Sequence, residues 1–229
     1  MLSSQFDVMD TVEYAPGRLA DVFGEPSQPT ALFWHGMQPD SRAAVRVLAE
    51  AVADLDLAVI APDWNSRNAD GGRADLINSV EFARKQADGL ILIGWSLGGV
   101  AAAGLTLRAA EFDVRVLHTV CLGGAFMAPD PISGGHVLDQ VPDGASPASF
   151  TLLVGDADDV VPVSAATEFA AALRARDWRV DIVEVAADHG SIAGARYDPA
   201  AERYEPADDA ATHAVVRDVA ARIATAVRG

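Results

Sequence analysis

A Gly-x-Ser-x-Gly pentapeptide between an apolar run and an alanine-rich run restricts the fold of this chain more than any other feature. Its residues are Gly94, Trp95, Ser96, Leu97 and Gly98. Such a serine sits on a sharp, strained turn from a strand into a helix, where only small neighbours fit. The pattern therefore predicts a strand before the turn, a helix after it, and a serine hydroxyl above the edge of a sheet. The Leu97 N–H, at the start of that helix, can donate to a developing oxyanion. The alternative is a purely structural turn in a glycine-rich loop.

Apolar, β-branched runs alternate with amphipathic runs along the rest of the chain. This alternation is typical of an α/β fold, with a mostly parallel central sheet and helices on both faces. We expect core strands near residues 30–35, 57–62, 89–93, 114–122, 149–154 and 180–185. We expect helices near 40–54, 73–87, 97–110, 164–175 and 208–227, with Asp40, Ser164 and Asp208 placed to act as N-caps. Residues 11–14 and 19–23 flank a Pro-Gly pair and predict an antiparallel hairpin at one edge.

Length and apolar patterning limit the class of protein. The 229 residues suffice for one α/β domain spanning 1–229, and no Pro/Ser-rich linker divides them. The apolar stretches are interrupted well short of the roughly 18 residues that a membrane span needs. Residues 1–7 have neither the basic nor the apolar part of a secretory signal. We therefore expect a cytoplasmic protein.

The charge balance argues against nucleic acid and anionic membranes as partners. The formal net charge is −16, whereas binding phosphate backbones requires clustered Lys and Arg. The only cysteine, Cys121, excludes an internal disulfide and a multi-cysteine metal site, and we interpret it as a small core residue. The sequence does not indicate an oligomeric state.

A serine hydroxyl is a poor nucleophile at neutral pH, so Ser96 would need a histidine base and an acceptor that orients this base. Of the five histidines, His189 alone lies in a loop just after a predicted strand and late in the chain, which makes it the strongest candidate base. The turn after the strand at 149–154 carries three carboxylates, Asp156, Asp158 and Asp159. One of them can face the histidine. For Asp156 and Asp159 we favour a structural role, in which the side chain solvates the turn or caps the next helix.

With these residues in this order, the chain resembles serine hydrolases of the α/β-hydrolase fold over nearly its full length. The order nucleophile, acid, histidine is the order of that family. The family's acid turn reads G-x-x-D-x-x-V-P, which Gly155, Asp158, Val161 and Pro162 match. The resemblance therefore selects Asp158 as the acid of a Ser96–His189–Asp158 triad.

The resemblance also implies an oxyanion hole. His35 and Gly36 end a predicted strand and are similar to the family's H-G motif, in which the next residue, here Met37, gives a backbone N–H. His35 would then shape the loop, and the Leu97 N–H would be the second donor. A single glycine at this place, together with the hairpin around residue 17, resembles small carboxylesterases. The short interval between residues 123 and 149 implies little or no cap domain and a shallow, open pocket.

These resemblances imply a serine hydrolase that cleaves carboxylic esters of small or soluble substrates through an acyl-enzyme. No metal and no organic cofactor is expected. Acyl transfer to an alcohol, thioester cleavage and amide cleavage use the same triad and stay open, as does a non-catalytic binding protein on a hydrolase scaffold. We expect the loops at 65–72 and 130–147 to border the pocket. The acidic segment 197–209 either lines the site or is a solvated surface loop.

Overall fold

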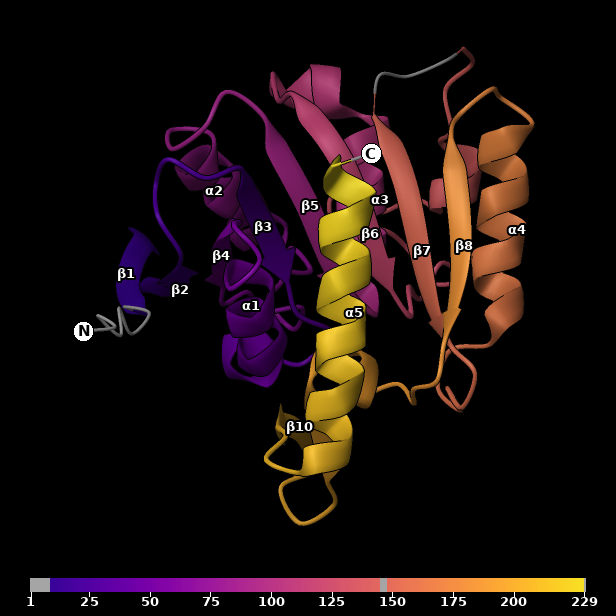
Figure 1. Ribbon diagram of the computed structural model, residues 1–229. Helices are drawn as coiled ribbons and strands as arrows, with labels where there is room; N and C mark the ends of the chain where they lie inside the picture. The colour runs from indigo at the N-terminus through magenta and orange to yellow at the C-terminus, as the bar shows by residue number, and fades with distance from the viewer. Residues whose placement is uncertain (1–8, 145–147, 229) are drawn as a thin grey trace.

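The computed structural model describes residues 9–144 and 148–228. The predictions for residues 1–7, and for the part of the 130–147 loop at 145–147, lie outside the described residues. Within them, eight strands form one sheet in the order β1-β2-β4-β3-β5-β6-β7-β8 (Figure 1). β1 pairs antiparallel with β2, β2 pairs antiparallel with β4, and every other neighbouring pair in this sheet is parallel. The mostly parallel sheet and the antiparallel edge hairpin are as predicted.

The elements follow the predicted alternation closely. The strands of this sheet are β1 (Asp10–Ala15), β2 (Arg18–Phe23), β3 (Thr30–Trp34), β4 (Ala58–Pro62), β5 (Leu90–Trp95), β6 (Val116–Leu122), β7 (Ser149–Gly155) and β8 (Val180–Val185). The α-helices are α1 (Arg46–Ala53), α2 (Arg73–Ala83), α3 (Leu97–Leu107), α4 (Val163–Arg174) and α5 (Ala210–Arg228). Every residue of β3, β4 and β5 is buried, which explains their unbroken apolar runs, because helices cover both faces of a central parallel strand.

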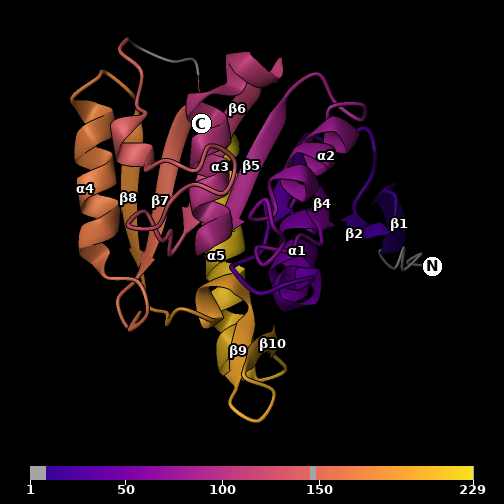
Figure 2. The ribbon, with the colours of Figure 1, turned by 180° about the vertical axis from the view of Figure 1, so that it is seen from behind.

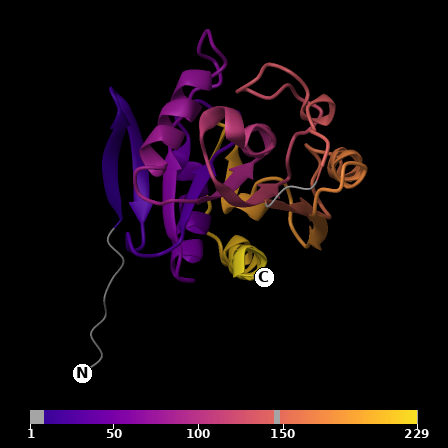
Figure 3. The same ribbon diagram turned by 90° about the horizontal axis from the view of Figure 1, so that it is seen from above.

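Helices cover both faces of the sheet, as predicted (Figures 2 and 3). α1 and α5 pack on one face and share an apolar cluster with β3, β4 and β5. α2 and α3 pack on the other face, and α3 and α4 share a third cluster with β6 and β7. The core is thus divided into layers on either side of the sheet. Each large apolar side chain buried there stabilises the fold by about 1.5–3 kcal/mol.

Three predicted N-caps are wrong. α5 begins at Ala210, two residues later than expected, and Asp209 caps it instead of Asp208. The two carboxylate oxygens of Asp209 lie 2.8 Å from the backbone N and the hydroxyl of Thr212. Ser164 is the second residue of α4, so it lies inside the first turn. Asp40 has a left-handed backbone conformation, φ 50°, two residues before a short 3-10 helix over Arg42–Val45, and α1 starts only at residue 46.

The connections determine how open the molecule is at one end. Between β6 and β7, the described residues hold one 3-10 helix, Val137–Asp139, and otherwise loops, in agreement with little or no cap domain. The segment before α5 differs from an irregular loop, because β9 (Ala195–Asp198) and β10 (Arg203–Pro206) pair as a separate antiparallel hairpin. In the part of the chain that the structure describes, none of the helices combines the length and the hydropathy of a membrane span.

Candidate active site

Ser96 lies on a strained turn between β5 and α3. Its φ is 55° and its ψ is −119°, a conformation that side-chain-bearing residues rarely adopt. The turn is tight because Gly94 and Gly98 approach each other: a Cβ at Gly94 would lie 2.2 Å from the Gly98 carbonyl oxygen. A Cβ at Gly98 would lie 2.3 Å from the carbonyl oxygen of His35. The pentapeptide therefore forms the predicted strand–turn–helix geometry, and Ser96 is partly exposed at its apex.

His189 and Asp158 form a buried pair. The Nδ1 atom of His189 is 2.8 Å from Oδ2 of Asp158, and their side chains are 4% and 2% exposed. Oδ1 of Asp158 accepts hydrogen bonds from the backbone N–H groups of Val160 and Val161, at 2.9 and 2.8 Å. Burial by itself raises the pKa of Asp158, but the hydrogen bond from His189 and the backbone donors outweigh it and leave the pKa below its usual value. The acid is therefore a carboxylate at neutral pH.

Gly123 also belongs to this site, and the sequence analysis missed it. It follows β6 with φ 49°, and a Cβ there would lie 2.9 Å from Oδ2 of Asp158 and 3.4 Å from Nδ1 of His189. Only a glycine leaves room for the acid and the histidine to meet at this point. A Gly-Gly pair directly after a strand was the signal available in the sequence.

His35 organises the loop that follows β3. It is fully buried, its Nδ1 is 2.8 Å from the Gly36 carbonyl oxygen, and its Nε2 accepts from the N–H groups of Ser41 and Trp64, both at 3.2 Å. These partners require a neutral ring with the proton on Nδ1. Burial agrees with this, because it lowers the pKa of His35 to about 3. His35 thus shapes the loop that carries Met37.

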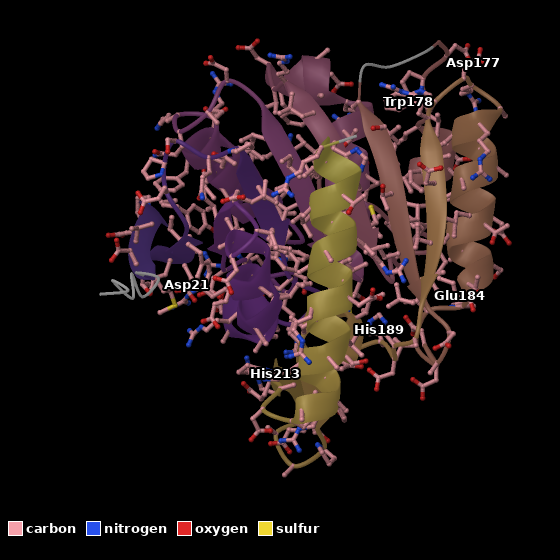
Figure 4. All side chains as sticks on the ribbon, viewed as in Figure 1. Asp21, Asp177, Trp178, Glu184, His189 and His213 are labelled. Carbon is pink, nitrogen blue, oxygen red and sulfur yellow. The ribbon has the colours of Figure 1, made fainter. Side chains whose placement is uncertain are left out.

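One cavity of about 710 Å³ brings the predicted residues together. It is lined by Ser96, His189, Met37 and Leu97, and Asp158 lies behind the histidine. Figure 4 shows His189 beyond the carboxyl ends of β7 and β8, beside the first turns of α5. The loops at 65–72 and 130–147 contribute to the wall, as predicted, through residues 66, 67, 70, 71, 130, 131 and 134. Two residues of the acidic segment, Glu202 and Tyr204, line it as well, so that segment borders the site.

Neighbouring residues hold this arrangement together. Trp95 is buried, its Nε1–H donates to the His189 carbonyl oxygen at 2.8 Å, and its ring also lines the cavity. Oδ1 of Asp156 accepts from the Ala187 N–H at 3.2 Å, so this carboxylate ties two loops and caps no helix. Asp159 is exposed. Among the described residues, no group of three or more His, Cys, Asp and Glu side chains is arranged to hold a metal ion.

Comparison with known proteins shows the fold. Protein-family models and curated proteins give no match to this chain. Many solved structures do match, and among them is Thermogutta terrifontis esterase 2 phosphoramylated by tabun, with 15% identity over 95% of this chain and 94% of that chain, at a TM-score of 0.72. The thioesterase domain from the curacin biosynthetic pathway has 12% identity over 98% of this chain and 100% of that chain, at a TM-score of 0.61.

A further structure is the same Thermogutta esterase with bound butyrate, with 16% identity over 80% of this chain and 84% of that chain, at a TM-score of 0.64. At these identities the likeness concerns the arrangement of the chain in space. The protein has the α/β-hydrolase fold that the sequence resemblance implied.

Proposed function

We propose that the protein is a serine hydrolase that cleaves carboxylic esters of small substrates. The observation that carries this proposal is the geometry of one cavity, which is lined both by Ser96 on a strained turn and by a histidine paired at 2.8 Å with a buried carboxylate. The positive φ of Ser96 is energetically unfavourable, and strained backbone conformations of this kind cluster at functional sites. The α/β-hydrolase fold and its esterase neighbours support the same reading.

In the proposed mechanism, His189 accepts the proton of Ser96 as Oγ attacks the ester carbonyl carbon. The Asp158 carboxylate holds the imidazole through Nδ1–H, so that Nε2 is the basic nitrogen, and it stabilises the imidazolium that forms. The N–H groups of Met37 and Leu97 stabilise the oxyanion. The alcohol leaves with the proton from His189, and a water activated by the same histidine hydrolyses the acyl-enzyme. Losing one oxyanion donor costs on the order of 10²–10³ in kcat.

The open cavity supports small or extended soluble esters. The described residues place no helical cap over it, and the Thermogutta neighbour is known with bound propionate and butyrate, which supports short acyl chains here. Thioester cleavage is the second candidate, because one neighbour is a thioesterase domain that this chain covers completely. The triad chemistry is common to both, so only substrate profiling separates them. A cytoplasmic location stays a prediction.

Hydrolysis of p-nitrophenyl esters from acetate to long chain tests the proposal, together with Ser96→Ala and His189→Ala. We expect turnover of the short esters by the wild type, and a loss of at least about 10³-fold in kcat for both variants. A fluorophosphonate should label the wild type and leave Ser96→Ala unlabelled. Ser164→Ala is the matched control on the surface of α4 and should retain full activity. Neither turnover nor labelling in the folded wild type would refute the proposal and favour a binding protein.

A further inference from the structure

The β9–β10 hairpin lies between the loop after β3 and the candidate histidine, although it follows the histidine in the chain. Figures 1 and 2 show it below the carboxyl ends of the parallel strands. Nη2 of Arg203, the first residue of β10, donates to the Ser41 hydroxyl at 3.0 Å. Ser41 belongs to the loop that carries Met37, and its N–H is also bound by His35. The hairpin is therefore attached to the loop that holds the proposed oxyanion donor.

The Gln38 side chain makes a closer attachment. Its Oε1 accepts a hydrogen bond from the backbone N–H of Tyr204, and its Nε2 donates to the Tyr204 carbonyl oxygen at 3.0 Å. The same Nε2 lies 3.0 Å from the Ser41 hydroxyl. The amide thus pairs with both backbone polar groups of one residue, as a neighbouring strand would. Gln38 follows Met37 directly, so this pairing fixes the peptide next to the proposed donor.

The ring of Tyr204 reaches the other half of the site. It packs edge-on against Trp95 with ring centroids 5.0 Å apart, and its centroid is 6.0 Å from that of His189. Trp95 in turn contacts the ring of His189 at 5.4 Å and donates to its carbonyl oxygen. The backbone of Tyr204 therefore holds the loop after β3, residues 35–41, which we call the oxyanion loop because it carries Met37. The side chain of Tyr204 packs against the histidine. One residue joins the two parts of the machinery.

The oxyanion loop needs such a support. Met37 is 66% exposed and follows a glycine, so its own side chain does little to fix the direction of its N–H. The loop relies on hydrogen bonds instead: His35 binds the Gly36 carbonyl on one side of Met37, the Ser66 hydroxyl donates to the Met37 carbonyl, and Gln38 binds Tyr204 on the other side. A donor in an oxyanion hole must be held within about 0.5 Å of its working position. We propose that Gln38 is a positioning residue, which fixes the Met37 N–H by pairing with Tyr204, and that the β9–β10 hairpin is the brace between the oxyanion loop and His189. The inference rests on the proposed function.

The test compares Gln38→Met, which keeps the length of the side chain and removes its hydrogen bonds, with Gln86→Met, the same substitution in the exposed turn that follows α2. We expect Gln38→Met to lower kcat about 10- to 100-fold at nearly unchanged KM, because the donor is displaced but still present. The Tm should fall by roughly 2–4 °C, because the partners of the amide lose their hydrogen bonds. Backbone amide exchange in residues 36–41 should become faster. Gln86→Met should match the wild type in each measurement.

Gln38→Glu gives a second measurement that a merely structural role would not change. The ionised carboxylate accepts from the Tyr204 N–H but cannot donate to its carbonyl, whereas the protonated form can do both. The ratio of kcat for Gln38→Glu to kcat for the wild type should therefore rise from pH 7 to pH 4.5, toward the ordinary glutamate pKa of about 4.3.

The outcomes separate the two proposals. Unchanged kcat in Gln38→Met, or unchanged exchange in 36–41, would overturn the brace even in a fully active esterase. If the ratio of kcat for Gln38→Glu to kcat for the wild type is the same at pH 7 and pH 4.5, the hydrogen bond from Gln38 to the Tyr204 carbonyl has no positioning role, which would also overturn the proposal. If the wild type hydrolyses no ester but exchange in 36–41 responds to Gln38→Met as expected, the serine hydrolase is refuted, and the tie between Gln38 and the hairpin is supported.

Discussion

At the scale of single residues, the candidate site depends on a glycine that leaves space as much as on the side chains proposed to react. Asp158 and His189 were predicted from a motif and from the order of residues along the chain. Gly123 was not, because nothing in its sequence neighbourhood says that an acid and a histidine from two other segments will meet beside it. The contact exists only after β6, β7 and β8 lie side by side. The Gly-Gly pair after β6 marks a tight turn, but which groups meet beside it follows only from the tertiary structure.

Gly123→Ala should therefore disable the site although it replaces none of the three residues of the proposed triad. The new Cβ would lie 2.9 Å from Oδ2 of Asp158, so the carboxylate must shift and release the histidine. We expect kcat/KM for a short p-nitrophenyl ester to fall on the order of 10²-fold. Gly17→Ala is the control, because Gly17 has φ 72° with nothing within 4 Å of a Cβ, so it adds backbone strain alone. Equal kcat/KM in the two variants would contradict this role of Gly123.

At the scale of elements, burial decides what can be predicted. β3, β4 and β5 are buried throughout and were found from their apolar runs, whereas the β9–β10 hairpin has only one buried residue, Ala195, and was expected as an irregular segment. Its two strands alternate apolar and polar residues over only four positions each and contain no Val, Ile or Leu, so the pattern is too short and too polar to indicate a core strand. What holds it are contacts between residues far apart in the chain, such as Tyr204 with Trp95 and with Gln38. Tertiary contacts of this kind leave no local signal.

Helix ends were predicted less well than helices, and α5 shows why. Asp208 and Asp209 are adjacent carboxylates, and only the backbone geometry decides which one caps the helix. Asp209→Ala removes two hydrogen bonds to Thr212 and should lower the Tm by roughly 2–4 °C, the usual effect of losing an N-cap in a chain of this size. Asp208→Ala is the matched control and should leave the Tm nearly unchanged. Calorimetry that ranked the two variants in the reverse order would contradict the assignment of the cap.

At the scale of the whole molecule, acid stability depends on two buried histidines on different parts of the sheet. Burial lowers the pKa of His35 to about 3 and that of His118 to about 4. His118 is 8% exposed and contacts the hydroxyls of Ser149 and Thr151 through its two ring nitrogens. The charges of Asp181 and Arg179 shift its pKa in opposite directions, upward and downward respectively.

The interpretation of residues 1–229 as one domain stays a prediction, and a single unfolding transition is its expected signature.

The folded protein therefore binds fewer protons at these two histidines than the unfolded chain between pH 6.5 and pH 4. Their contribution to stability is fully present above pH 6.5 and is lost as the pH falls, by up to 1.4 kcal/mol per pH unit for each histidine. His118→Gln removes one of the two groups, so its free energy of unfolding should fall by about 2 kcal/mol less than that of the wild type between pH 7 and pH 5. Urea unfolding at pH 7, 6 and 5 measures this difference. His136→Gln replaces an exposed histidine and should follow the wild type. Parallel losses in all three proteins would mean that His118 is protonated in the folded state, against the cause assigned to its low pKa.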